Sequence, residues 1–463
     1  MTRPDKGTGS WDQKLFTYTN GPTTLSWPRM ITTGDDHNTI HLLANTNAAY
    51  QGQAFGIVYS RSLDGGTSWD LQNEVVDGTG AEYYTEITAD QYVWANPVGD
   101  NIAFLVASAW HDLFMMKSTD NGDSWEKTVI WEHPYPFFDW NITVTDTLFC
   151  VDNSASIALD NNGKAHVVFG ISRVIHAVVG TGYSYYPYVD GIGYWNEDMP
   201  TFSDDLSALA PPQYGYPTSE MIEDVNYIGW TQDVDGDGEI TFINTSTGFP
   251  MSYRELGVST MPSITIGPDN WIAVVFSSTT ETYDNSEWNF KKLWMRIKPS
   301  GMNWGPFIHL TQDLSHFFDE SIYPVAYPTF DNDIHILYNN DGMPGTALGE
   351  NHVYIENMTT YMKVEQFVGV EENQPLSAES ESLIISPNPS KGMVNASYSI
   401  NRASHVTMMV SEISGRAVIN KTLGWKNAGD YMYSFDLENF CPGIYFISLK
   451  TSHQTITKKL IIN

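Results

Sequence analysis

The chain has 463 residues, of which 41% are hydrophobic and 13% aromatic, and this composition excludes global disorder. Its formal net charge of −32 disfavours nucleic acid and anionic lipid surfaces as partners. No apolar run reaches about 18 residues, so the sequence predicts no transmembrane segment.

Short apolar runs punctuated by Gly, Asn, Asp, Thr and Ser dominate the chain, and no long amphipathic helix is found. These features predict an all-β fold. Residues 1–10 are polar, do not form a signal peptide and are expected to be a disordered leader remnant. Cys150 and Cys441 are expected in different domains, so no disulfide between them is predicted.

A repeated phrase runs through residues 11–368: an apolar strand, a turn rich in Asp and Asn, and a second apolar strand. Its copies are residues 30–43, 99–106, 157–169, 229–243, 268–276 and 330–338. Most copies lie about 60 residues apart, the size of one four-stranded propeller blade with long loops. The repeat predicts a β-propeller of about six blades over 11–368, with an insertion around 180–260 and with residues 13–19 closing the ring.

A second motif, S-x-D-x-G-x-x-W, occurs at residues 62–69 and 118–125, each time after a short strand. Asp and Gly suit a tight hairpin turn, and the Trp can pack beneath the sheet. The motif resembles the Asp-box, or BNR repeat, of sialidase-like β-propellers, and residues 300–304 resemble a degraded copy. The resemblance implies a fold and no particular activity, because Asp-boxes also occur in propellers without sialidase activity.

A sialidase-like glycosidase is one function that such a fold allows. It would need an arginine triad for the substrate carboxylate, a Tyr–Glu nucleophile pair and an Asp acid. Ser26 stands where the first arginine is normally found, two places before Pro28, and few other arginines are available. The catalytic residues are therefore unknown, and a glycoside hydrolase that pairs Asp112 with Asp319 or Glu320 stays open as an alternative.

Aromatic and charged residues gather in loops that are expected at one end of the strands, including the Tyr-rich segment 183–188. Rings and carboxylates together suit sugar recognition, although each ring could instead pack its loop onto the body. The predicted ligand-binding residues are His111, Asp112, Trp140, Arg173, His176, Tyr283, Trp288 and Asp319. The leading hypothesis is recognition or adhesion through an extracellular glycan or another surface ligand. A structural or protein-binding surface component is the further alternative.

The segment 233–239 reads D-V-D-G-D-G-E and matches the start of an EF-hand-type calcium loop. Carboxylates at alternate positions can surround one Ca²⁺, and Gly238 permits the sharp turn. The predicted metal ligands are Asp233, Asp235, Asp237, Glu239, Thr241 and Asn244. Asn244 replaces the usual acid at the twelfth position and no EF-hand helices flank the loop, so a solvated acidic turn is the alternative to a structural calcium clip.

Residues 369–382 are polar and acidic and are predicted to be a linker. The tail 383–463 is β-patterned, with Pro387, Asn388 and Pro389 near its start, Gly415 and Arg416 in its centre, the segment 443–446, and a basic and apolar strand that ends at Ile462. In order and spacing these elements resemble the type A C-terminal sorting domain of type IX secretion system cargo of Bacteroidota. The resemblance implies a small β-sandwich, handling by the type IX machinery, and a secreted or outer-surface location.

Overall fold

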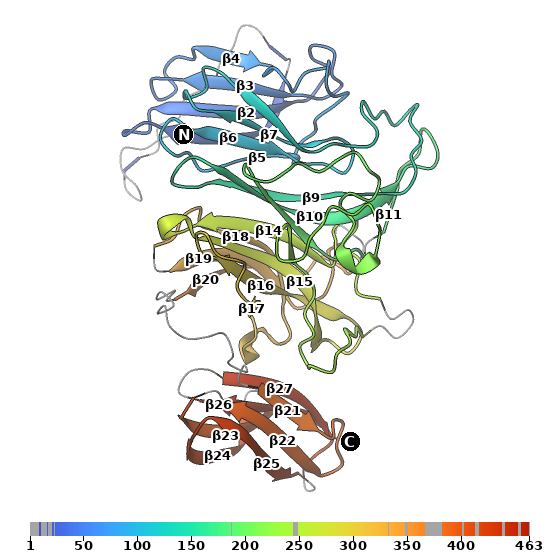
Figure 1. The fold of residues 1–463 in the computed structure, drawn as a ribbon, viewed down its shortest axis with the longest axis vertical. Helices are drawn as coiled ribbons and strands as arrows, with labels where there is room; N and C mark the ends of the chain where they lie inside the picture. The colour runs from blue at the N-terminus through green and yellow to red at the C-terminus, as the bar shows by residue number, and fades with distance from the viewer. Residues whose placement is uncertain are drawn as a thin grey trace.

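The computed structural model describes residues 9–10, 16, 21–22, 24–186, 188–243, 249–331, 333–347, 351–365, 382–400, 402–412, 416–437, 440–451 and 455–462. Its regular elements are β-strands, together with three 3₁₀ turns within the described residues: η1 (Pro212–Tyr214), η2 (Pro268–Asn270) and η3 (Leu314–His316). The prediction of an all-β fold is confirmed. Figure 1 shows the strands grouped into sheets that follow one another from the blue upper end to the red lower end.

The first and second sheets are antiparallel meanders whose strands pair in chain order. The first sheet consists of β1 (Leu25–Thr33), β2 (Thr39–Thr46), β3 (Ile57–Ser62) and β4 (Leu71–Glu74). The second consists of β5 (Tyr92–Trp94), β6 (Ile102–Val106), β7 (Leu113–Ser118) and β8 (Glu126–Trp131). This four-stranded meander is the topology of a propeller blade.

The third, fourth and fifth sheets repeat the pattern with variations. The third contains β9 (Leu148–Leu159), β10 (Ala165–Ile175), β11 (Ser184–Tyr185), β12 (Ile192–Asn196) and β13 (Tyr227–Gly229). The fourth contains β14 (Ser259–Ile266), β15 (Ile272–Asp284), β16 (Asn289–Lys298) and β17 (Ile308–His309). The fifth contains β18 (Glu320–Ala326), β19 (Ile334–Asp341) and β20 (Met358–Val364).

The described part of the body therefore holds five sheets, and the sixth blade predicted from the copy at 229–243 is wrong. Gly229 ends β13, which pairs with β12 of the third sheet, and no strand is found among the described residues 230–243. The backbone of that loop is satisfied by side chains rather than by a ladder. Thr241 N donates to Glu281 Oε2 (3.1 Å) and Ile243 N donates to Asn289 Oδ1 (2.6 Å), so the loop is fastened to β15 and β16.

Apolar side chains fill the spaces between consecutive sheets in four clusters. All five residues of β6 are buried, because this strand has a neighbouring sheet on each face, and its sequence is correspondingly apolar throughout. The predicted closure of a ring by residues 13–19 lies outside the described residues except at Phe16. The Phe16 ring contacts Trp69 of the first sheet, with 4.5 Å between centroids.

A β-bulge recurs on the first strand of four sheets. A non-glycine residue with positive φ marks it each time: Trp27, Asn153, Met261 and Tyr323. Proline follows this residue in three of the four strands, at Pro28, Pro262 and Pro324. The bulges also join neighbouring sheets, since Ala109 N donates to Asn153 Oδ1 (3.0 Å) and Met261 N donates to Ser154 Oγ (3.0 Å).

The two S-x-D-x-G-x-x-W segments form matching turns in the first and second sheets. Asp64 Oδ1 accepts hydrogen bonds from the N–H groups of Thr67 (2.9 Å) and Ser68 (2.7 Å). Asp120 Oδ1 likewise accepts from Ser124 N (2.9 Å). Trp125 packs edge-on against Tyr59 and Phe104, so the second turn contributes to the core between the first two sheets.

The tail forms two antiparallel sheets that share one hydrophobic cluster. One sheet has the order β21 (Ser382–Ser386), β22 (Met393–Ile400), β25 (Gly429–Asp436). The other has the order β24 (Ala417–Lys426), β23 (Ser404–Glu412), β26 (Gly443–Lys450), β27 (Thr455–Ile462). Strand β22 alternates strictly between buried and less buried side chains, as expected for a sheet with one face on a core.

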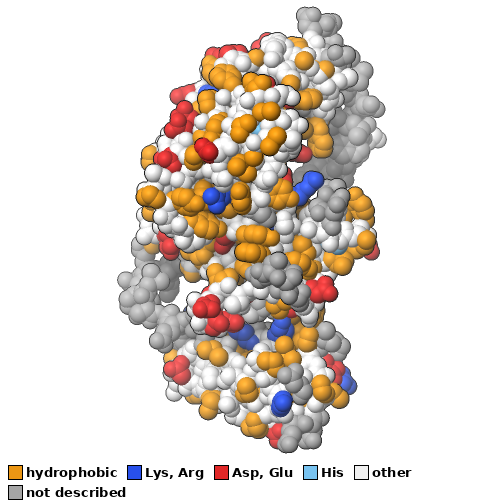
Figure 2. All heavy atoms as spheres, turned by 90° about the vertical axis from the view of Figure 1, so that its right-hand side faces the viewer, with side chains coloured by type: hydrophobic (Ala, Val, Ile, Leu, Met, Phe, Trp, Pro, Cys, Tyr) orange, Lys and Arg blue, Asp and Glu red, His pale blue; other side chains and the backbone are white. Residues whose placement is uncertain are grey.

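The tail domain lies against the lower end of the body through an aromatic and charged contact. Phe446 packs on Phe317, with 4.5 Å between ring centroids, and Tyr283 belongs to the same buried cluster. Lys459 Nζ lies 2.6 Å from Asp284 Oδ2, an ion pair in which the Asp284 side chain is only 3% exposed. Figure 2 shows basic side chains beside acidic ones where the lower domain meets the body.

Candidate functional site

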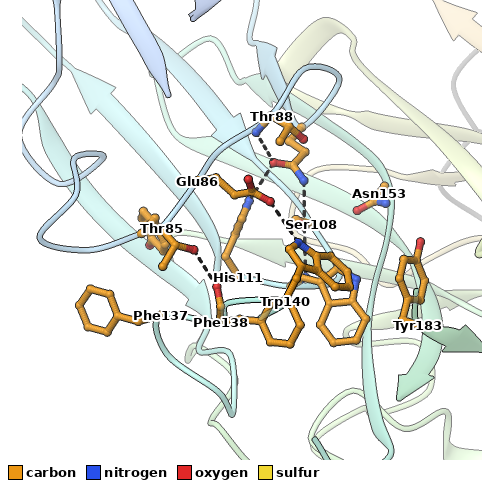
Figure 3. Close-up of a pocket in the computed structure, with 13 residues that line it drawn as sticks. Thr85, Glu86, Thr88, Ser108, His111, Phe137, Phe138, Trp140, Asn153 and Tyr183 are labelled. Carbon is orange, nitrogen blue, oxygen red and sulfur yellow. Dashed lines mark hydrogen bonds between the residues drawn. The ribbon is translucent and has the colours of Figure 1, made fainter. Parts of the chain in front are cut away.

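A small aromatic pocket lies where loops of the second sheet meet the third sheet, and its volume is about 180 Å³ (Figure 3). The segment before β5, the β6–β7 loop, the loop after β8, the β9 bulge and the loop after β10 all contribute to it. Its lining residues are Tyr84, Thr85, Glu86, Thr88, Gln91, Ser108, Trp110, His111, Phe137, Phe138, Trp140, Asn153 and Tyr183. This volume suits one small ligand, since it corresponds to about six molecules of liquid water.

Aromatic rings form one wall of the pocket. Trp110 stacks on Phe138, with centroids 4.5 Å apart, and meets Trp140 edge-on at 5.1 Å. Tyr183 completes the group, 5.6 Å from Trp140. Trp110, Trp140 and Tyr183 are each only half-buried, so part of each ring surface remains accessible. Such surfaces stack on the C–H faces of sugar rings.

Polar groups line the pocket beside the rings, and hydrogen bonds position them. Trp140 Nε1 donates to Glu86 Oε1 (3.2 Å), which places this carboxylate beside the indole in Figure 3. Gln91 Oε1 accepts from Thr88 N (2.7 Å), and Gln91 Nε2 donates to Ser108 Oγ (3.1 Å). Convergent carboxylate, amide and hydroxyl groups beside aromatic rings are a typical arrangement for binding a polyhydroxylated ligand.

His111 is held within this wall. Its ring nitrogens lie 2.9 Å from the Asp112 carbonyl oxygen and 3.2 Å from Gln91 Oε1. Burial lowers the pKa of His111 to about 4, because the imidazolium would lose its hydration, and it lowers the pKa of His133 in the same way to about 4. Both rings are therefore neutral at neutral pH, where they position the loops.

The structure brings together several of the ligand-binding residues predicted from sequence. His111 and Trp140 line the pocket, and His176 lies behind it with its ring 5.3 Å from that of Trp140. Asp112 lies beneath the wall, where its Oδ2 accepts from the Tyr84 hydroxyl (2.7 Å). Arg173 is farther along β10, and its guanidinium carbon lies 5.1 Å from the centroid of the Tyr186 ring.

The other three predicted ligand-binding residues belong to the fourth and fifth sheets. Tyr283 is buried in the cluster that meets the tail domain. Trp288 lies in the turn between β15 and β16, where its N–H donates to Asn285 Oδ1 (2.8 Å). Asp319 Oδ2 accepts from Asn340 Nδ2 (3.2 Å) beside β18. These side chains do not join Trp140, and the carboxylates of Asp112 and Asp319 belong to separate hydrogen-bond networks.

A buried charged network, not predicted from sequence, connects Glu320 with residues of the fourth sheet. The Tyr253 hydroxyl and the Lys291 N–H (3.0 Å) donate to Glu320 Oε1, and Gly345 N donates to Oε2 (2.8 Å). Lys291 Nζ donates to the carbonyl oxygens of Gly257 (3.0 Å) and Val258. Burial raises the pKa of Glu320 to about 7 and lowers the pKa of Lys291 to about 8. Both carboxylate oxygens face protein donors, an arrangement typical of an internal anchor.

The acidic loop gathers three of the predicted metal ligands. Carboxylate oxygens of Asp233, Asp235 and Asp237 lie within 4.8 Å of one another, and all three residues are exposed. Asp233 folds the loop by accepting from Gly236 N (2.6 Å) and Gly238 N (2.9 Å). Glu239 and Thr241 are exposed at the end of the loop, and Asn244 lies outside the described residues. Lys458 of β27 donates to the Val234 carbonyl oxygen (2.6 Å) within the same loop.

Several solved structures, sugar-acting enzymes among them, show a weak likeness to this chain. An α-L-arabinanase of Penicillium chrysogenum is 13% identical over 81% of this chain and 88% of its own, with a TM-score of 0.33. A family 43 arabinoxylan arabinofuranohydrolase of Bacillus subtilis is 9% identical over 94% of both chains, with a TM-score of 0.29. A protein of unknown function from Dyadobacter fermentans is 10% identical over 83% and 92%, with a TM-score of 0.30.

The tail gives a definite family match. No match was found among curated proteins. The family model described as a secretion system C-terminal sorting domain matches residues 385–463. None of the described helical turns has the length and apolar character needed to cross a membrane. Residues 385–463 therefore belong to the family of type IX secretion system C-terminal sorting domains, which mark a protein for export out of the cell.

Proposed function

We propose that the body is a sialidase-like, Asp-box β-propeller that binds an extracellular glycan or another polyhydroxylated surface ligand in the aromatic pocket, outside the cell or on its outer surface. The pocket is the observation that carries this proposal. The half-buried rings of Trp110, Trp140 and Tyr183 line it together with the carboxylate of Glu86 and the amide of Asn153. Ring faces stack on sugar C–H groups while carboxylate and amide bind the hydroxyl groups.

Binding without hydrolysis is favoured over a glycoside hydrolase. Glycosidases of the usual type place two carboxyl groups about 5–10 Å apart across the scissile bond. Among the described residues that line the pocket, Glu86 is the one carboxylate. Asp112 lies behind the wall with its oxygens bonded to the Tyr84 hydroxyl and to His133 N. Glu320, the other carboxylate considered, belongs to the buried network of the fifth sheet.

A glycan array followed by titration calorimetry on the best ligand tests this proposal. Trp140→Ala removes one stacking face and is expected to weaken binding about tenfold or more. Glu86→Gln removes the charge but keeps an acceptor for the Trp140 indole, so it tests the carboxylate with less disturbance of the loop. Trp27→Ala is the matched control, because Trp27 is 55% exposed in β1 and does not line the pocket.

The outcomes separate the candidate functions. Binding that Trp140→Ala and Glu86→Gln weaken, with Trp27→Ala unchanged and no sugar released, supports a glycan-binding protein. Release of reducing sugar that is lost in Glu86→Gln would make the protein a glycoside hydrolase. Ligand binding that survives both pocket variants would refute the assignment of this pocket, and no binding to any glycan would favour a structural or protein-binding surface component.

A structural Ca²⁺ in the acidic loop is a second proposal, supported by the convergence of Asp233, Asp235 and Asp237. Oxygen ligands at this spacing suit a hard divalent cation. Terbium luminescence with calcium competition measures occupancy, and Asp235→Asn is expected to lower the affinity at least tenfold. Asp139→Asn, the same neutralising change in the loop after β8, is the control. Equal terbium signals in the two variants would exclude the site.

A further inference from the structure

A hydrogen-bonded histidine–tyrosine pair occurs in two sheets of the body. The second ring nitrogen of the histidine has different neighbours in the two sheets. In the first sheet, Nδ1 of His41 lies 2.8 Å from the Tyr59 hydroxyl, and in the third sheet Nδ1 of His166 lies 2.8 Å from the Tyr194 hydroxyl. The two ring pairs have the same stacked arrangement, with centroids 6.1 Å apart in both. The two pairs can therefore be compared atom by atom.

The second ring nitrogen distinguishes them. Nε2 of His41 contacts Thr33 Oγ1 (3.0 Å) and Asn121 Oδ1 (3.1 Å), and Asn121 belongs to the S-x-D-x-G-x-x-W turn of the next sheet. Nε2 of His166 is buried and has no hydrogen-bond partner among the described residues, although the residue is only 4% exposed. A buried ring nitrogen of this kind gains from a hydrogen bond, so a polar group bound beside it would be stabilised.

The turn of the next sheet explains the difference. In the fourth sheet the degraded motif has Pro299 at the position of the motif's Asp, with Gly301 at that of its Gly. No side chain of this turn takes the place of Asn121. A pocket of about 420 Å³ lies there instead, between the third and fourth sheets, and His166, Asp160 and Ser300 are among its lining residues. The aromatic pocket has no lining residue in common with it.

The neighbouring groups favour one tautomer of His166. Asn196 Oδ1 accepts from Asp198 N (2.9 Å), so Asn196 Nδ2 is the atom that donates to the Tyr194 oxygen (2.9 Å). The Tyr194 hydroxyl can then donate its own proton to Nδ1 of His166, and the Asp160 carboxylate 3.6 Å from Nε2 favours a proton on that nitrogen. Burial lowers the pKa of His166 to about 4, so the ring is neutral at neutral pH and its proton lies on Nε2.

An acceptor faces this donor across a short gap. Asp160 Oδ2 lies 3.6 Å from His166 Nε2, which is longer than a hydrogen bond between nitrogen and oxygen. The other oxygen of Asp160 is occupied, because it accepts from Asn162 N (2.8 Å) and Lys164 N (2.9 Å). Lys164 is itself paired with Asp198 at 2.7 Å, so these two charges balance at the rim of the pocket.

We propose that this pocket is a second binding site, in which a hydroxyl group of a small neutral polyol or sugar accepts a hydrogen bond from His166 Nε2–H and donates one to Asp160 Oδ2. A hydroxyl is the group that can donate and accept at one atom, as this pair requires. The site is independent of the proposed function of the aromatic pocket.

The test uses the full chain carrying Trp140→Ala, so that binding in the aromatic pocket does not contribute. The probes are myo-inositol and methyl α-D-glucopyranoside, and the readouts are titration calorimetry and the ¹⁵N resonance of His166 Nε2 in histidine-labelled protein. Asp160→Asn keeps one side-chain oxygen, which can still accept from Asn162 N and Lys164 N. It replaces Oδ2, the proposed acceptor of the ligand hydroxyl, with an amide nitrogen. Ser300→Tyr fills the pocket from an exposed turn, and Asn303→Tyr places the same ring on that turn outside the lining.

The proposal predicts that at least one probe shifts the Nε2 resonance and binds in the Asn303→Tyr variant as in its parent. Asp160→Asn is expected to weaken binding at least tenfold, and Ser300→Tyr to abolish it. Failure of both probes to shift the His166 resonance would overturn the proposal. Undiminished binding in Ser300→Tyr, with an unchanged thermal unfolding temperature, would also overturn it. Neither result would bear on the aromatic pocket, which is tested separately.

Discussion

Mild acid is expected to destabilise the body through its buried histidines. Burial lowers the pKa of His41, His111, His133 and His166, each from 6.5 to about 4. In the unfolded chain the same rings regain their ordinary pKa and bind protons below about pH 6.5. The unfolded state then holds more protons than the folded state, so the free energy of unfolding falls as the pH drops from 6.5 towards 4.

The size of the effect follows from the shifts. Between about pH 7 and about pH 5, each histidine removes about 2 kcal/mol from the free energy of unfolding, and four together remove roughly 7 kcal/mol. Glu320 acts in the opposite direction, because burial raises its pKa to about 7 and protonation relieves its buried charge. Protonation of Glu320 therefore adds about 2 kcal/mol to the free energy of unfolding over the same pH range. The net loss from these five groups is roughly 5 kcal/mol, comparable to the whole stability of many domains. Burial also lowers the pKa of His309, which adds to the loss, and raises the pKa of Asp152 and Asp190, which reduces it.

Urea unfolding followed by tryptophan fluorescence at the two pH values measures this loss. His133→Gln keeps a donor for the Ala109 carbonyl oxygen, which His133 Nε2 contacts at 3.1 Å, but removes the titrating ring. It should reduce the pH dependence by about 2 kcal/mol. His405→Gln is the control, since His405 is exposed on the tail domain. A loss below about 1 kcal/mol in the parent protein would refute the reasoning from burial.

Two substitutions test packing and docking. Asp284→Asn keeps the oxygen that accepts from Ser286 N but leaves the Lys459 ammonium without its partner, and it should weaken the contact between tail and body by about 3 kcal/mol. Hydrogen exchange in β27 should then accelerate, and an unchanged exchange rate would contradict the expected role of the ion pair. In Gly193→Ala the new Cβ would lie 2.3 Å from the Phe169 ring, so thermal unfolding should show a loss of about 1–3 kcal/mol. Gly182→Ala, with nothing within 4 Å of the added carbon, should change stability by less than about 0.5 kcal/mol, and equal losses in both variants would refute the packing argument.

The strand repeat could be predicted because each meander has a recognisable sequence pattern, in which apolar runs alternate with turns. The copies at 30–43, 99–106 and 157–169 each contribute to one of the first three sheets. The copy at 229–243 misled because the alternating segment 239–243, with apolar residues at 240, 242 and 243, gives the same signal whether or not a partner strand exists. The side chains that hold this loop, Glu281 and Asn289, lie about 40 residues away in sequence.

The candidate site could be predicted only where the sequence concentrates aromatic residues. Trp110, His111 and Trp140 are conspicuous in loops rich in rings. Glu86 and Asn153 are not, because an isolated carboxylate or amide in a loop carries no pattern until the fold places it beside an indole. The bulge that presents Asn153 could not be predicted either. In the other three bulges a proline follows the residue with positive φ, whereas no proline follows Asn153.

The contact between the sorting domain and the body also has a consequence for what happens when the two are separated. Residues 366–381 join them covalently, so Phe446 and Lys459 meet Phe317 and Asp284 at an effective concentration on the order of millimolar. A contact of this kind holds while the chain is intact even if its intrinsic affinity is modest. A single cut in the connecting segment turns docking into a bimolecular equilibrium, and dilution alone then releases the body without any change in the contact itself.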